Sequence, residues 1–173
     1  MDHIAGTPVA PEALEAMLPY LGDNFGNPAS IHHHGELPQD ALFRSREAVA
    51  RLIGAETEEV IFTSCGTESN NLAIKGVAFD SIGVKSHIVV SAIEHYSVLY
   101  SAKSLERFGF EVTQVPVDMM GRVDPDAVRR VLRPETALVL VEMRQGDGEL
   151  EILCSKPGNI RLAGARSSWA GLG

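Results

Sequence analysis

Short apolar segments alternate with helical segments along the middle of this chain, and this alternation restricts the fold more than any other feature. The apolar runs lie at residues 60–63, 87–92, 112–117 and 137–141, and the helical patterns between them at 67–79, 98–108 and 126–132. Short buried strands that alternate with helices form parallel sheets with helices on both faces. The sequence therefore predicts an α/β fold with three layers and a mainly parallel sheet, and it leaves the strand order open.

Two more helices are expected before the first apolar run. Apolar residues recur at helical spacing from Pro11 to residue 21, and proline is acceptable in a first turn. Residues 41–53 repeat the pattern, and Gly54 favours a carboxyl-terminal stop. Residues 22–38 contain Gly, Asn, Pro and His without a period, which predicts an ordered loop of the kind that often lines a site.

The composition changes near residue 142. The following segment is rich in glycine, and its apolar spacing fits neither a helix nor a strand for long. We therefore divide the sequence into a domain at 1–141 and an irregular tail at 142–173.

Charge and composition argue against several classes of protein. The formal net charge is -8 and the basic residues form no cluster, so neither nucleic acid nor an anionic membrane is an expected partner. No apolar run approaches the roughly 18 residues that a membrane span needs, and the start does not resemble a signal peptide. Two cysteines, Cys65 and Cys154, provide no disulfide framework. We expect a cytoplasmic protein with reduced thiols.

Residues 63–71 (TSCGTESNN) stand between an apolar run and a helix. Gly66 and Thr67 would then present backbone N–H groups and a hydroxyl at a helix amino terminus, which is a phosphate-binding geometry. The alternative is a capping box, in which Thr67 or Ser64 caps the helix and Glu68 supports its first turn. Local sequence leaves both interpretations open.

Other polar residues allow more than one role. His95 follows the apolar run 87–92, at a strand end where α/β proteins bind ligands, although a histidine there commonly serves as a cap. Cys65 is either a nucleophile activated by the helix amino terminus or, as we prefer, a small buried residue in place of a glycine. Adjacent histidines at 32–34 cannot all converge on one ion, so we expect no metal site.

Taken together, these segments resemble the cysteine desulfurase family of aminotransferase class V in order and spacing. The similar segments are 2–8 (DHIAGTP), 25–32 (FGNPASIH), 61–76 (IFTSCGTESNNLAIKG), 94–99 (EHYSVL) and 109–125 (GFEVTQVPVDMMGRVDP). The resemblance extends to about residue 141. It implies the incomplete large domain of a fold-type-I transferase that uses pyridoxal phosphate, acts on L-cysteine, passes sulfur to acceptors as in iron–sulfur cluster assembly, and forms a homodimer.

The resemblance also implies roles for individual residues. Gly66 and Thr67 would bind the cofactor phosphate, His95 would stack on the pyridine ring and assist proton transfer, and Asn27 would lie near the active site. After Val141 the family has an Asn-Asn-Glu-x-Gly segment, and later an aspartate, a Ser-x-His-Lys segment and a persulfide cysteine. None of these is present here, and none of the lysines occupies the Schiff-base position.

Three hypotheses follow. The first is a truncated or frameshifted cysteine desulfurase that is inactive alone. The second is a non-catalytic fragment that binds pyridoxal phosphate or another phosphate, or that pairs with a full-length subunit. The third, an unrelated nucleotide-binding α/β protein, is weakened because the sequence has no GxGxxG or GxxxxGK[ST] run.

Overall fold

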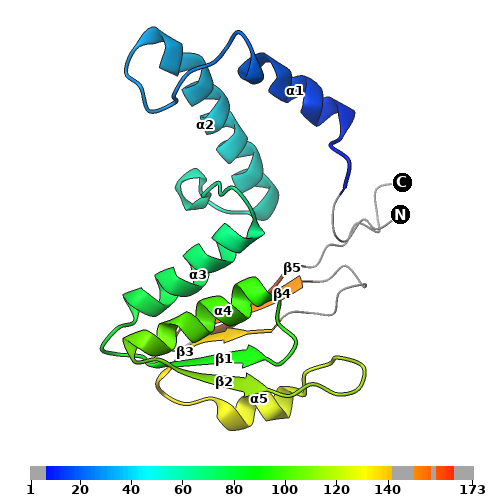
Figure 1. Cartoon of the computed structure of the whole chain (residues 1–173), viewed down its shortest axis with the longest axis vertical. Helices are drawn as coiled ribbons and strands as arrows, with labels where there is room; N and C mark the ends of the chain where they lie inside the picture. The colour runs from blue at the N-terminus through cyan, green and yellow to red at the C-terminus, as the bar shows by residue number, and fades with distance from the viewer. Residues whose placement is uncertain (1–6, 142–149, 157–158, 166–173) are drawn as a thin grey trace. The chain divides into compact units, whose positions relative to one another are not determined.

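The computed structural model describes residues 7–141, 150–156 and 159–165, which form two compact units at 1–62 and 63–173 (Figure 1). The first unit contains α1 (Pro11–Leu21), α2 (His33–Ile53) and the short 3-10 helix η1 (Thr57–Glu59). The bounds of α1 are those predicted. No residue of α1 is buried, so its apolar side chains stay exposed. The division predicted at residue 141 stays a prediction.

Helix α2 begins at His33, well before the predicted start at residue 41, and Pro38 lies inside it. Proline lacks an N–H, so the carbonyl of His34 loses its intrahelical donor. The backbone of Gly26 lies against that carbonyl, where a Cβ would be only 1.9 Å from the His34 oxygen. The loop before α2 thus packs closely on its first turn. The composition of residues 22–38 and their lack of a helical period predicted a later start, whereas the helix includes residues 33–38.

The second unit holds a parallel sheet in the order β2-β1-β3. Its elements are α3 (Gly66–Asp80), β1 (His87–Ser91), α4 (Tyr96–Ser104), the 3-10 helix η2 (Leu105–Phe108), β2 (Glu111–Val115), α5 (Pro125–Val131) and β3 (Thr136–Leu140). Each strand and helix predicted between residues 67 and 141 is present. The predicted helix 98–108 is divided into α4 and η2.

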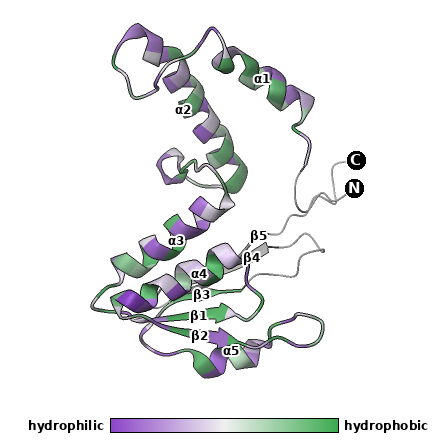
Figure 2. Cartoon of the chain, viewed as in Figure 1, coloured by the Kyte–Doolittle hydropathy of each residue, from purple (hydrophilic) through white to green (hydrophobic). Residues whose placement is uncertain are grey.

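Helices cover both faces of this sheet, which confirms the predicted three layers. One core packs α3 and α4 against Ile88, Val90 and Leu138, and the other packs α5 against Val89 and Val139. Alternate residues of β1 thus enter opposite cores, as the strand period requires. Figure 1 shows α3 and α4 on one side and α5 on the other, and Figure 2 shows mainly apolar residues along β1 and β3.

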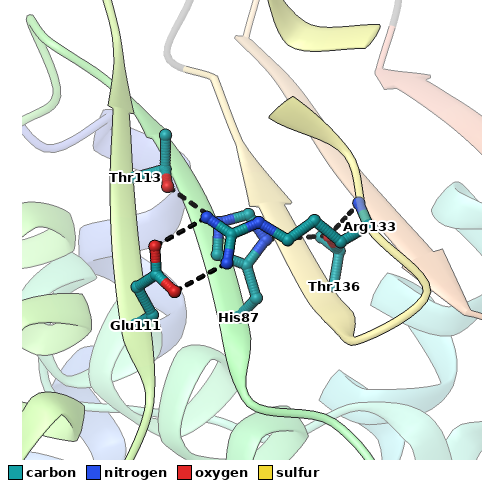
Figure 3. A network of polar contacts seen from close by, with 5 residues as sticks. All are labelled: His87, Glu111, Thr113, Arg133 and Thr136. Carbon is teal, nitrogen blue, oxygen red and sulfur yellow. Dashed lines mark hydrogen bonds and ion pairs between the residues drawn. The ribbon is translucent and has the colours of Figure 1, made fainter. Parts of the chain in front are cut away.

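A polar network joins the amino ends of the three strands (Figure 3). The His87 ring is only 1% exposed and contacts the hydroxyls of Thr136 through Nδ1, at 2.9 Å, and of Thr113 through Nε2, at 2.8 Å. Arg133 donates two hydrogen bonds of 2.6 Å each to the carboxylate of Glu111. Burial, and then the charge of Arg133, lower the pKa of His87. The ring is therefore neutral in the folded protein at pH 7.

Two segments differ from the sequence predictions. Residues 60–63 are not paired in a sheet, and Ile61 and Phe62 are 66% and 44% exposed. Where no regular element was expected, β4 (Leu150–Lys156) and β5 (Asn159–Ala165) form an antiparallel hairpin. Apolar and polar residues alternate there only over 150–152 and 159–162, so the periodicity gave a weak strand signal, although the Pro157-Gly158 dipeptide favours a turn. Within the described ranges, no helix is long and apolar enough to cross a bilayer.

Candidate functional site

The amino terminus of α3 carries no side-chain cap. Cys65 is the N-cap residue, with extended backbone at φ -166 and ψ 168, and its side chain makes no capping hydrogen bond. The N–H groups of Gly66 and Thr67 have no intrahelical acceptor, because a helix leaves its first donors unpaired. Neither Ser64 nor Thr67 is therefore the cap, whereas Glu68 supports the start of the helix by accepting the Ser64 backbone N–H, as the capping-box alternative expected. The first turn with its positive dipole end is therefore suited to an anion.

The loop before α3 is held by its own side chains. The Glu68 carboxylate accepts hydrogen bonds of 2.6 Å from both the backbone N–H and the hydroxyl of Ser64. These bonds lower the pKa of Glu68, so this carboxylate is charged. Thr63 and Ser69 join their hydroxyls at 2.5 Å across the same turn. Residues 63–69 therefore have a defined conformation without a ligand.

Cys65 is exposed, so the interpretation as a small buried residue is wrong. The nearby backbone N–H of Glu68 and, after it, the nearby Ser64 hydroxyl lower the pKa of the thiol. The oxygen–sulfur distance to Ser64 is 3.8 Å. The N–H of Glu68, in the same first turn as Gly66 and Thr67, thus already favours a negative charge on the neighbouring sulfur.

His95 follows β1 and is the N-cap of α4. Its Nδ1 accepts a hydrogen bond of 3.1 Å from the Ser97 backbone N–H, and it lies 2.7 Å from the Ser97 hydroxyl. The amide of Asn70, on α3, donates to that hydroxyl at 2.8 Å. The capping role considered for His95 is therefore confirmed. The structure also links His95 to the helix that begins at Gly66.

Asn70 and Ser97 were missed by the sequence analysis. They lie 27 residues apart, and neither belongs to a local pattern that indicates a partner on another helix. Only the packing of α3 beside α4 brings them together, and that packing follows from the shared core of apolar residues on both helices. The one sequence signal for this contact was the polar side chain of Asn70 on the inner face of α3.

The carboxyl end of β1 carries a second polar contact. The Ser91 hydroxyl donates to the carboxylate of Glu94 at 2.6 Å, and both residues are buried. Parallel sheets bind ligands outside the carboxyl ends of their strands, and Glu94 and His95 stand there. Lys85 lies at the opposite end of β1, where its ammonium group donates to the carbonyl of Pro134.

The remaining predicted residues lie in the first unit. The side chain of Asn27 accepts a hydrogen bond of 2.9 Å from the Ala29 backbone N–H, and its expected place near the cofactor stays a prediction. His32, His33 and His34 are exposed. Across the described residues, no three His, Cys, Asp or Glu side chains are grouped to hold a metal ion.

The aminotransferase class-V family matches residues 1–145 of the chain. The cysteine desulfurase IscS of Dictyoglomus turgidum is 49% identical over 141 residues, which cover 82% of this chain and 36% of that protein. The cysteine desulfurase of Homo sapiens is 47% identical over 142 residues, which cover 31% of its length. The chain thus spans about a third of the length of these relatives.

Solved structures show the same relationship. A NifS-like protein superposes with a TM-score of 0.76 at 36% identity, over 82% of this chain and 39% of that one. SspA in complex with cysteine superposes with a TM-score of 0.74 at 40% identity, over 82% of this chain and 41% of that one. The predicted fold class is confirmed, and the chain corresponds to part of a larger fold in these structures.

Proposed function

Because this chain belongs to the aminotransferase class-V family, we propose that it is a part of a cysteine desulfurase-like enzyme and that α3 binds the phosphate of pyridoxal phosphate. The uncapped amino terminus of α3 carries this proposal. L-cysteine is the proposed substrate and a homodimer the proposed assembly, by similarity to the cysteine desulfurases. The Schiff-base lysine that the resemblance implies matches no lysine of this sequence, so we expect no activity from this chain alone.

The residues present fit a phosphate group. Gly66 and Thr67 would donate through their backbone N–H groups, and the exposed Thr67 hydroxyl would add a third donor. No atom lies within 4 Å of the position of a Cβ on Gly66, so the space beside the terminus is open. The charged Glu68 turns its carboxylate to Ser64, which satisfies that charge within the loop. An anion at the terminus would therefore meet donors.

The position and the imidazole chemistry of His95 suit a residue that contacts the cofactor ring and transfers a proton. It follows the carboxyl end of β1 and is tied to α3 through Ser97 and Asn70. We propose that its imidazole stacks on the cofactor ring and assists proton transfer at the substrate. Pyridoxal phosphate, when bound, supplies an electron sink for the reaction.

No lysine of this chain is proposed to form the Schiff base. Lys85 donates to the Pro134 carbonyl at the amino end of the sheet, away from His95, and Lys103 is exposed on α4. We therefore expect no release of sulfide from L-cysteine by this chain alone, above a control of free pyridoxal phosphate. The non-catalytic alternative, a cofactor-binding or dimer-partner fragment, is favoured by the exposed apolar residues of α1.

A ligand without an aldehyde gives the cleanest test of the phosphate site. Pyridoxine 5′-phosphate cannot form a Schiff base with a surface lysine, so its binding reports the phosphate and ring contacts alone. Titration by calorimetry should detect binding of pyridoxine 5′-phosphate and much weaker binding of pyridoxine. Equal affinity for the two ligands, or no binding of either, would contradict the proposal.

A further inference from the structure

We propose that Asn70 and Ser97 are positioning residues that hold the His95 imidazole in the tautomer with its proton on Nε2. The observation that carries this inference is a directed chain of hydrogen bonds from α3 through Ser97 to His95 Nδ1. Its consequence for catalysis rests on the proposed function, because the orientation of His95 matters there for proton transfer. The tautomer itself is a property of this chain without a cofactor.

The backbone determines the state of Nδ1. The Ser97 N–H lies 3.1 Å from Nδ1, and a backbone N–H can only donate. Nδ1 must therefore offer its lone pair, and a neutral imidazole then carries its proton on the other ring nitrogen. This backbone bond alone favours the Nε2–H tautomer, as in any histidine that caps a helix in this way.

Asn70 adds a hydrogen bond to Ser97 that capping of the helix does not require. Its amide donates to the Ser97 oxygen at 2.8 Å, so the hydroxyl hydrogen is left to donate to Nδ1, 2.7 Å away. Ser97 is only 8% exposed, which limits competition from water. The hydroxyl thus donates in one direction, toward the ring, and Asn70 sets that direction from another helix.

The link also joins the two halves of the proposed site. Asn70 lies about one helical turn after Gly66 on α3, and His95 is the N-cap of α4. The helix that would hold the phosphate therefore orients the imidazole that would lie on the ring. A displacement of α3 would disturb both contacts together. Preorganisation of this kind is what a binding site gains from rigid elements.

Nitrogen-15 spectra of the histidine rings test the proposal, because the two ring nitrogens shift differently in the two tautomers. The variant His95→Gln identifies the His95 signals. The neutral imidazole of the wild-type chain should show Nδ1 unprotonated. In Asn70→Asp the carboxylate cannot donate and instead accepts the Ser97 hydroxyl proton, so the ratio of Nδ1–H to Nε2–H forms should rise about 2- to 10-fold, the range for one hydrogen bond of ordinary net strength.

Asn71→Asp is the matched control. Asn71 is the neighbouring residue on α3, and its amide donates to the Thr67 carbonyl rather than toward His95. The Asn71→Asp variant introduces the same charge as Asn70→Asp and should leave the tautomer ratio of His95 unchanged. Equal changes in the two variants would overturn the proposal, since charge alone would then explain them. Comparable circular dichroism spectra establish that both variants fold.

Substitutions of Ser97 distinguish the effect of its hydroxyl on His95 from the effect of its backbone N–H. Ser97→Ala keeps the backbone N–H but loses the hydroxyl, and it should shift the ratio in the same direction as Asn70→Asp, while Ser97→Thr should restore it. A wild-type ratio in Ser97→Ala would also overturn the proposal. None of these spectra needs pyridoxal phosphate, so a chain that fails to bind the cofactor still gives a clear result, and the two failures remain distinct.

Discussion

The Nδ1 atom of His87 lies 2.9 Å from the hydroxyl of Thr136, so side chains as well as backbone join the first residues of the neighbouring strands β1 and β3. The Thr136 oxygen also accepts the backbone N–H of Arg133 at 2.9 Å. This pair occupies the amino end of the sheet, and the proposed site occupies the carboxyl end. A stabilising network and a ligand site thus use opposite edges of one parallel sheet.

The burial of His87 beside Thr136 leads us to predict that the stability of the protein depends on pH. Burial and Arg133 lower the pKa of His87 below its ordinary value, against opposing contributions from Glu111 and Glu135. The unfolded chain then binds the proton more readily, so the stability from neutral His87 is present above about pH 6.5 and is lost as the pH falls through the folded pKa. The free energy of unfolding in urea should decrease from pH 7 to pH 5.

The variant His87→Gln should show a smaller decrease over that interval than the wild type. The control is His32→Gln, which changes an exposed histidine in the first unit. The His32→Gln variant should show the same decrease in unfolding free energy from pH 7 to pH 5 as the wild type. An unchanged slope in His87→Gln would contradict the assignment of the effect to His87.

Thr136→Val should cost about 1–3 kcal/mol of unfolding free energy, because it leaves the buried ring and the Arg133 N–H without a partner. Thr113→Val is the matched control, since Thr113 contacts the other ring nitrogen but is partly exposed, so that water can replace its hydroxyl. Urea denaturation compares the two. An equal loss of unfolding free energy in the two variants would contradict the prediction that the buried hydroxyl matters more than the partly exposed one.

Cys65 should react with iodoacetamide at a lower pH than an ordinary exposed thiol, because the Glu68 N–H and the Ser64 hydroxyl lower its pKa. A Cys154→Ser background isolates its signal. The further substitution Ser64→Ala removes the second contribution and should move the alkylation profile to higher pH. Mass spectrometry of the modified peptide measures the rate, and identical profiles with and without Ser64 would contradict this account.

The exposed face of α1 predicts association of the chain. Leu14, Met17 and Leu18 are 46%, 50% and 56% exposed, and they follow one another at helical spacing. Leu18→Glu should lower the apparent mass in light scattering at high protein concentration, whereas Glu15→Gln on the same helix should not. A wild-type chain that stays monomeric at all concentrations would contradict the prediction.

The sequence was most informative where local patterns and tertiary packing agree. Helix α1 has the predicted bounds, and the apolar strands pack into the two cores as their burial requires. The glycine, asparagine, proline and histidine content of residues 22–38 misled the prediction of where α2 begins, and the close approach of Gly26 to His34 has no local sequence signal. For the site, Gly66, Thr67 and His95 could be named from motifs, but not the link through Asn70 and Ser97.

The uncapped terminus of α3 is the central claim, and one pair of variants at Gly66 tests it most directly. Proline is favoured at the first position of a helix, the preceding Cys65 already has extended backbone, and the space around Gly66 is open. Gly66→Pro should therefore fold but lose one N–H donor, whereas Gly66→Ala keeps the donor and adds only a methyl group.

The measurement is the affinity for pyridoxine 5′-phosphate in both variants. Loss of one hydrogen bond to a charged group corresponds to about a 10- to 100-fold weaker affinity, so Gly66→Pro should bind that much less tightly than the wild type. Gly66→Ala should bind within a few-fold of it. Equal affinities in the two variants would contradict a phosphate site at this helix terminus.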